Sequence, residues 1–140
     1  MLTGEIPPYI CNFLSLYILD LSLNNITRLI PQCLGKLSNC LIVLNLKNNT
    51  LQETIPNIFT NESWLETMDL SANKLEGKVP RSLEDCKLLE FLDLGYNFIP
   101  GGGGVMGPIF FSYCYVSGYM FGSNTRFGSD QTIITPNKTT

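Results

Sequence analysis

The chain has 140 residues, which is enough for one domain. It carries 9 Lys and Arg against 12 Asp and Glu, and this low net charge of −3 argues against nucleic-acid binding. It contains no His, which excludes Ser-His-Asp and Cys-His catalysis and zinc sites with His ligands. The carboxylates are scattered, with no pair suited to acid–base catalysis. We therefore expect a protein that is not an enzyme and that holds no metal or small-molecule cofactor.

One template recurs four times between residues 16 and 97. Each copy reads Leu-x-x-Leu-x-Leu-x-x-Asn, with Met in place of the second Leu in the third copy. The closing Asn residues are 25, 24 and 24 positions apart, and an Ile-Pro or Val-Pro pair keeps nearly the same step. These pairs end at Pro7, Pro31, Pro56 and Pro80. A period of this length lies within the range of leucine-rich repeats.

The alternating apolar positions predict one short strand in each copy, with one face buried. A single copy cannot bury its Leu side chains alone, so neighbouring copies must stack. We therefore predict an α/β solenoid, a leucine-rich-repeat coil of about four repeats with a short parallel β-sheet on its concave face. The closing amides lie where the chain leaves each strand, and they can both donate to and accept from backbone groups of adjacent turns. We expect a structural ladder formed by Asn24, Asn49, Asn73 and Asn97.

The segments around each Pro complete the repeat. Residues 32–36 and 81–85 are expected to form short helical or 3₁₀ turns on the convex side, because Pro suits a turn better than a sheet interior. Gly stands three residues before the Pro at Gly4 and Gly77, but the middle repeats have Arg28 and Glu53 there. We expect a strained turn and a less regular second small strand at these two positions.

Residues 100–140 differ sharply from the repeats. Every Leu lies at or before Leu94, whereas nine of the 12 Gly lie at or after Gly95. The aromatic residues of this stretch follow no repeat. We predict two parts: residues 1–99, a partial and uncapped set of leucine-rich repeats, and residues 100–140, an irregular Gly- and aromatic-rich tail that is disordered or non-native.

A partner is expected on the concave face, where the residues between the strand leucines are exposed. One column of this face, at positions 20, 45, 69 and 93, is mainly acidic, and three aromatic residues could anchor a peptide. The alternative is a solvated face without a ligand. The candidate ligand-binding residues are Tyr17, Asp20, Ser22, Asn45, Lys47, Glu66, Asp69, Ser71, Glu90, Phe91, Asp93 and Tyr96.

Three segments sharpen the comparison with known families: Ile-Pro-Gln-Cys-Leu-Gly-Lys-Leu-Ser at 30–38, Leu-Glu-Gly-Lys-Val-Pro-Arg-Ser-Leu at 75–83, and the stretch 85–97. They resemble plant-type extracellular leucine-rich repeats, as in the ectodomains of plant receptor-like proteins. The resemblance covers residues 2–99. It implies a protein- or peptide-binding module from a truncated cell-surface receptor of defence or developmental signalling. The partners implied are a peptide or protein ligand and a co-receptor, without nucleic acid.

Two alternatives remain: a secreted inhibitor of cell-wall-degrading enzymes, built from similar repeats, and a non-functional gene fragment. The resemblance places the parent receptor at the plasma membrane, facing outward. This chain begins in mid-repeat, and we identify neither a signal peptide nor a convincing transmembrane helix in it.

An extracellular location would allow disulfide bonds between the cysteines and N-glycosylation of the Asn-x-Ser/Thr sequons. Cys11 and Cys33 lie on adjacent coils shortly after their Pro residues, so a disulfide between them is a candidate. Four sequons are candidate N-glycosylation sites, at Asn25, Asn48, Asn61 and Asn137.

Overall fold

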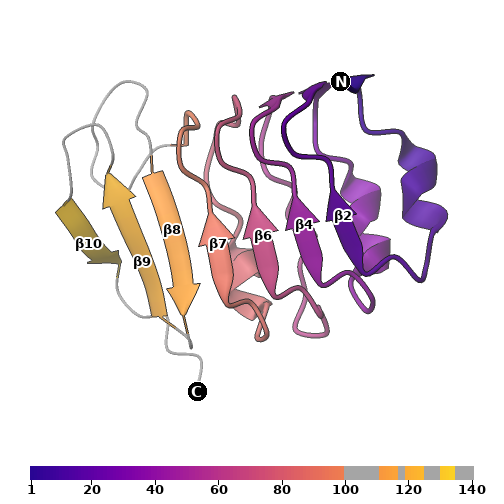
Figure 1. Ribbon diagram of the computed structural model, residues 1–140. Coiled ribbons are helices and arrows are strands. Elements are labelled where there is room, and N and C mark those ends of the chain that lie inside the picture. Colours follow the sequence, from indigo (N-terminus) through magenta and orange to yellow (C-terminus); the bar gives the residue numbers. More distant parts are fainter. Residues whose placement is uncertain (100–110, 117–118, 125–129, 135–140) are drawn as a thin grey trace.

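The computed structural model describes residues 1–99, 111–116, 119–124 and 130–134. Its central element is a parallel sheet of four strands in the order β2-β4-β6-β7, one from each repeat (Figure 1). The strands are β2 (Ile18–Asp20), β4 (Val43–Asn45), β6 (Thr67–Asp69) and β7 (Phe91–Asp93). Each strand pairs with the next so that equivalent repeat positions stand side by side. The predicted leucine-rich-repeat coil with a parallel sheet is confirmed.

A second, smaller parallel sheet runs along another edge of the coil. It contains β1 (Thr3–Gly4), β3 (Asn25–Arg28) and β5 (Thr50–Leu51), and an isolated bridge between Thr54 and Glu76 continues it. The chain turns with a left-handed backbone at the residue three positions before each Pro, with φ of 83° at Gly4 and 77° at Gly77.

The two non-glycine residues at this turn take the same conformation as the glycines. Arg28 has φ 69° and Glu53 has φ 67°, a region that costs a residue with a Cβ roughly 1–2 kcal/mol. The expected strain is therefore present at both. The expected irregularity appears after β5, where the ladder is reduced to a single bridge, whereas β3 continues regularly through Arg28.

Three 3₁₀ helices lie behind the main sheet and close the convex side (Figure 1). They are η1 (Pro8–Asn12), η2 (Gln32–Leu37) and η3 (Arg81–Asp85), and each starts directly after the extended Pro of its repeat. The third repeat has bends and turns, and no helix, after Pro56. A disulfide joins Cys11 of η1 to Cys33 of η2, with 5.8 Å between their Cα atoms. These are the two cysteines for which the sequence suggested a disulfide.

The core is a stack of leucines that point inward from every repeat. Leu46, Leu70 and Leu94 occupy one equivalent position and are fully buried, and Met68 is accommodated where the other repeats have Leu. Burial of each such side chain stabilises the folded state by about 1.5–3 kcal/mol relative to its exposure to water. Since these residues contact their equivalents one repeat away, the stack itself creates the core.

Three antiparallel strands follow the last repeat. They are β8 (Phe111–Val116), β9 (Tyr119–Asn124) and β10 (Asp130–Ile134), in the order β10-β9-β8, and β8 lies beside β7 (Figure 1). The sequence predicts an irregular tail, whereas these segments form strands. Their many aromatic and β-branched residues favour strands even without a repeat. The boundary between residues 99 and 100 stays a prediction.

Candidate functional site

The turn that leaves the concave sheet is built on the four closing asparagines. The Asn73 Oδ1 atom accepts a hydrogen bond from the Leu51 backbone N–H at 3.1 Å, and its Nδ2 group donates to the Leu46 and Leu70 carbonyls at 2.9 and 3.1 Å. Asn49 and Asn97 make the same set of bonds one repeat away, and all three side chains are buried. Asn24 is less buried and accepts from the Leu2 N–H. These amides join neighbouring repeats and are not available to a ligand.

The acidic column of the concave face also shapes this turn. Asp20 and Asp69 each accept, through Oδ1, the N–H and hydroxyl of the Ser two residues later, with O–O distances of 2.6 Å to the hydroxyls. Asn45 and Asp93 accept the equivalent N–H groups of Lys47 and Gly95. In every repeat, the Oδ1 atom of this residue therefore accepts the hydrogen bond that closes the turn.

Hydrogen bonds from Ser22, first from its hydroxyl and then from its backbone, lower the pKa of the Asp20 carboxyl below its ordinary value. The lowered pKa means that the charged form holds the turn together. Ser71 donates the equivalent hydrogen bonds to Asp69 and is itself buried, which removes it from the surface open to a partner.

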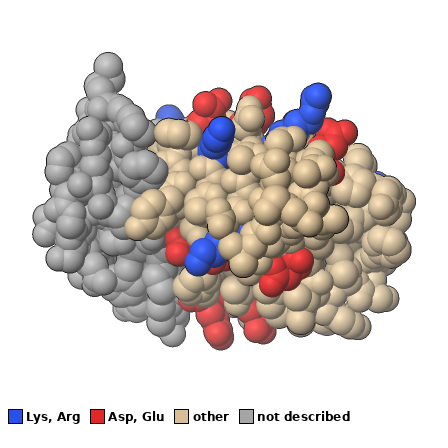
Figure 2. All heavy atoms as spheres, turned by 45° about the horizontal axis from the view of Figure 1, so that its top comes forward, with Lys and Arg blue, Asp and Glu red and all other residues tan. Residues whose placement is uncertain are grey.

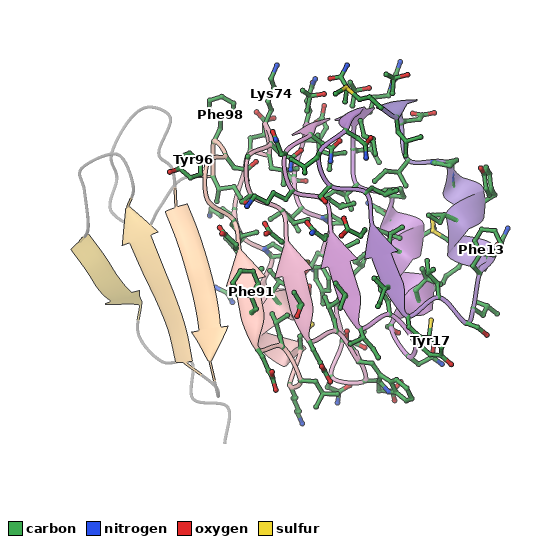
Figure 3. The ribbon with its side chains drawn as sticks, in the orientation of Figure 1. Phe13, Tyr17, Lys74, Phe91, Tyr96 and Phe98 are labelled. Carbon is green, nitrogen blue, oxygen red and sulfur yellow. A yellow bond between two sulfur atoms is a disulfide. The ribbon has the colours of Figure 1, made fainter. Side chains whose placement is uncertain are left out.

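Three aromatic candidates stand on or beside this face, from different repeats (Figure 3). Tyr17 lies at the foot of the sheet, Phe91 projects from β7, and Tyr96 lies in the turn above β7 (Figure 3). Their exposed fractions are 55%, 39% and 56%. The face therefore offers large apolar side chains as well as carboxylates.

Some exposed apolar residues that the repeat pattern places on this face are not among the candidate ligand-binding residues. Ile18 is 62% exposed, and Ile42 and Val43 are partly exposed although strands flank them on both sides. The signal was present in the sequence, since apolar residues occupy the positions between the strand leucines, where polar residues would suit a solvated face.

The glycosylation candidates within the repeats are all exposed. Asn25 begins β3, Asn48 lies in the turn after β4, and Asn61 lies in the loop before Leu65. Asn137 lies outside the described residues. Accessible side chains at these three positions agree with modification, and their use as glycan sites stays a prediction.

Other kinds of site find little support in the part of the chain that the structure describes. The cavity inside the second and third repeats measures about 30 Å³ and has an apolar lining, which is the space of one small molecule such as water. Cys40 and Cys86 are buried free thiols, and burial raises the pKa of Cys86. The described residues contain no group of three or more side chains arranged to hold a metal ion. None of their helices has the length and apolar character needed to cross a bilayer.

The geometry defines a protein with a repetitive scaffold and a broad exposed face on its four-stranded sheet. Two leucine-rich-repeat family models match the chain, at residues 15–37 and 41–99, which together make more than half of it. The chain belongs to the leucine-rich-repeat family.

Its relatives come from plants. The chain is 45% identical over 98 residues to receptor-like protein 35 of Arabidopsis thaliana, a match that covers 69% of this chain and 10% of the relative. It is 51% identical over 65 residues to receptor-like protein 6 of the same plant, which covers 46% of this chain and 6% of that protein. The chain thus spans about a tenth or less of these relatives, and its resemblance to a fragment of a receptor-like protein is confirmed.

Solved structures show the same coil. The PEPR1–AtPEP1 complex matches with a TM-score of 0.68 and 36% identity, over 72% of this chain and 14% of the other. The Arabidopsis HAESA ectodomain bound to an extended IDA peptide hormone matches with a TM-score of 0.64 and 35% identity, over 69% and 16%. A plant ice-binding protein matches with a TM-score of 0.64 and 32% identity, over 70% and 31%. The same coil thus occurs in receptors and in an ice-binding protein. The function of this chain therefore has to be inferred from its exposed residues rather than from its fold.

Proposed function

We propose that the chain is a peptide- or protein-binding part of a plant cell-surface receptor ectodomain. The concave face of the four-stranded sheet is the binding surface, and the parent protein acts in defence or developmental signalling together with a co-receptor. The observation that carries this proposal is the set of exposed aromatic and apolar side chains on a rigid, hydrogen-bonded sheet. Large rigid side chains of this kind dominate the energy of protein interfaces.

Two further observations support it. The Asn and Asp side chains fix the backbone of every turn next to the face, so a partner meets a surface that is ordered before binding. Preorganisation of this kind reduces the entropic cost of association. In addition, solved relatives with the same coil are complexes with peptides, as in PEPR1 with AtPEP1 and HAESA with IDA.

The test is a selection of displayed random peptides on the secreted, immobilised chain. Enriched peptides are then measured against Phe91→Ala and Tyr17→Ala, and against Trp64→Ala as a matched control. Trp64 is 48% exposed but lies in the loop before its strand rather than on it. We expect losses of about 1–2 kcal/mol or more for the two concave aromatics, as for interface anchors, and little change for the control.

Equal losses at all three positions, or no enriched peptide that depends on the concave residues, would contradict the proposal. The secreted-inhibitor alternative makes a different prediction for the parent transcript. A membrane-spanning segment encoded downstream of the repeats favours the receptor, and a complete capped protein without one favours the inhibitor.

A further inference from the structure

At the foot of the concave sheet, one residue from each repeat forms a row that is apolar in the first two repeats and acidic in the last two. Backbone hydrogen bonds align its members: Ile42 N–H donates to the Tyr17 carbonyl at 2.8 Å, Glu66 N–H to the Ile42 carbonyl at 2.9 Å, and Glu90 N–H to the Glu66 carbonyl at 2.8 Å. The row therefore reads Tyr, Ile, Glu, Glu from the first repeat to the fourth. Two apolar side chains stand beside two carboxylates.

The row above it strengthens the apolar half. Strand pairing aligns Ile18 with Val43, Val43 with Thr67, and Thr67 with Phe91. Ile18 and Val43 extend the apolar surface of Tyr17 and Ile42 over β2 and β4. Contiguous exposed apolar surface of this kind marks an interaction site.

The acidic half lies over β6 and β7. Glu66 and Glu90 are exposed directly before β6 and β7, neighbouring strands that lie about 4.8 Å apart. Asp69 and Asp93 stand further along the same strands, each with one carboxylate oxygen used in its turn. Like charges on adjacent strands repel, so a bound cation would relieve an unfavourable arrangement.

Within the described part of the chain, no carboxylate of this half forms an ion pair; the ion pair there joins Arg28 to Glu5 at 3.8 Å, beside the other sheet. Lys47 is the one basic residue among the concave positions of the four repeats, and it follows β4 in the apolar half. Figure 2 shows acidic side chains projecting at the lower margin of the coil.

The geometry points to one class of ligand for the surface proposed above, an extended peptide with an apolar block and a basic block. Its apolar residues lie over β2 and β4, and its Lys or Arg residues lie over β6 and β7. The four strands span about 14 Å, which corresponds to about four or five extended residues. The exposed ring of Phe91 adds a cation–π contact at the basic end. This inference rests on the proposed function, because it uses the same face.

The experiment uses the secreted 140-residue chain and three fluorescent synthetic peptides. The first has three Leu, one Gly and three Lys; the second has the same composition with Leu and Lys alternating; the third replaces the Lys block by Glu. Binding is followed by fluorescence anisotropy at low and high ionic strength. We expect the first peptide to bind most tightly and to weaken with salt, because exposed charges are screened.

Variants of the chain separate the two halves. Glu66→Gln with Glu90→Gln should weaken the first peptide about three- to tenfold at low ionic strength and remove most of its salt dependence. Ile42→Ser should weaken it to a similar degree at every ionic strength. Glu62→Gln removes an exposed carboxylate outside the face and should change nothing. Circular dichroism checks that all variants keep the fold.

Equal affinity for the blocked and alternating peptides, or full affinity in the double Gln variant, would overturn the inference. The peptide selection described above separates its failure from that of the proposed function. If selected peptides depend on Phe91 and Tyr17 but carry no basic block, the binding face stands and the ligand class is wrong. If no peptide depends on the concave residues, both proposals are wrong.

Discussion

Replacing Asn73 by Ala tests how far the ladder holds the coil together. The side chain is 6% exposed and makes four hydrogen bonds to the backbone. After its removal the Leu46 and Leu70 carbonyls keep one amide partner each, from Asn49 and Asn97. The Leu51 N–H loses its partner and stays buried.

The expected cost follows from these bonds. A buried N–H without a partner costs about 1–3 kcal/mol, and each lost bond to a carbonyl that keeps another partner costs less, about 0.5–1.5 kcal/mol. With one unpaired N–H and three lost bonds to carbonyls, the sum for Asn73→Ala is about 2.5–7.5 kcal/mol. This is a large part of the roughly 5–15 kcal/mol that stabilises a domain. Asn24→Ala is the matched control, since its bond to the Leu2 N–H is exposed to water and its bonds to the Leu21 and Ser22 carbonyls are only partly buried. We expect a smaller loss for it, about 1–3 kcal/mol.

Urea unfolding followed by circular dichroism measures both variants, with the free energy extrapolated to water. Because the two substitutions remove the same atoms from equivalent turns, the difference between them reports burial together with one extra bond, from the Asn73 Nδ2 group to the Leu46 carbonyl of the preceding repeat. Equal losses, or a loss below about 1 kcal/mol for Asn73→Ala, would refute the reasoning that these amides satisfy buried backbone groups.

Three further outcomes are expected. Gly77→Ala should destabilise the chain by about 1–2 kcal/mol in the same unfolding assay, because φ is 77° and the new Cβ would lie 2.6 Å from the Thr54 Cγ2 atom; wild-type stability would contradict this. Ser22→Ala should raise the pKa of Asp20 toward its ordinary value in an NMR titration. Since a lowered folded pKa adds stability above the ordinary Asp value and loses it as pH falls through the folded pKa, the variant should also lose stability at neutral pH but not in strong acid. Truncation after Ile99 removes β8 beside the last repeat and should expose the fully buried Leu94, lowering the urea midpoint or causing aggregation; an unchanged, monomeric melt would show that β8–β10 cover nothing.

Much of the coil is predictable because the same pattern of Leu and Asn positions recurs in each repeat. The Leu positions locate β2, β4, β6 and β7, and the closing asparagines locate the turns. The two residues Arg28 and Glu53 even predict where the backbone is strained, since the glycines at equivalent positions show what conformation the turn needs. Repetition turns a weak local signal into a firm one.

The candidate face was harder to predict. The column of Asp20 and Asp69 looked like a ligand-binding stripe, yet half of each carboxylate closes a turn onto the following Ser. The Asp-x-Ser spacing was the available signal, because an Asp side chain readily bonds the backbone two residues on. The strands after residue 110 could not be anticipated from a period, since no repeat runs through them; they pair as consecutive antiparallel strands, with Val116 opposite Tyr119 and Asn124 opposite Asp130.

The disulfide between Cys11 and Cys33 has a consequence for how the coil comes apart. In a stack where each repeat contacts only its neighbours, opening begins at an end and proceeds one repeat at a time. The crosslink closes a loop with a sequence separation of 22, a constraint that favours the folded state by roughly 3 kcal/mol. It binds η1 to η2, so the first repeat separates only together with the second. Amide hydrogen exchange in the first two repeats should therefore follow one common opening rate in the oxidised protein, and divide into two after reduction.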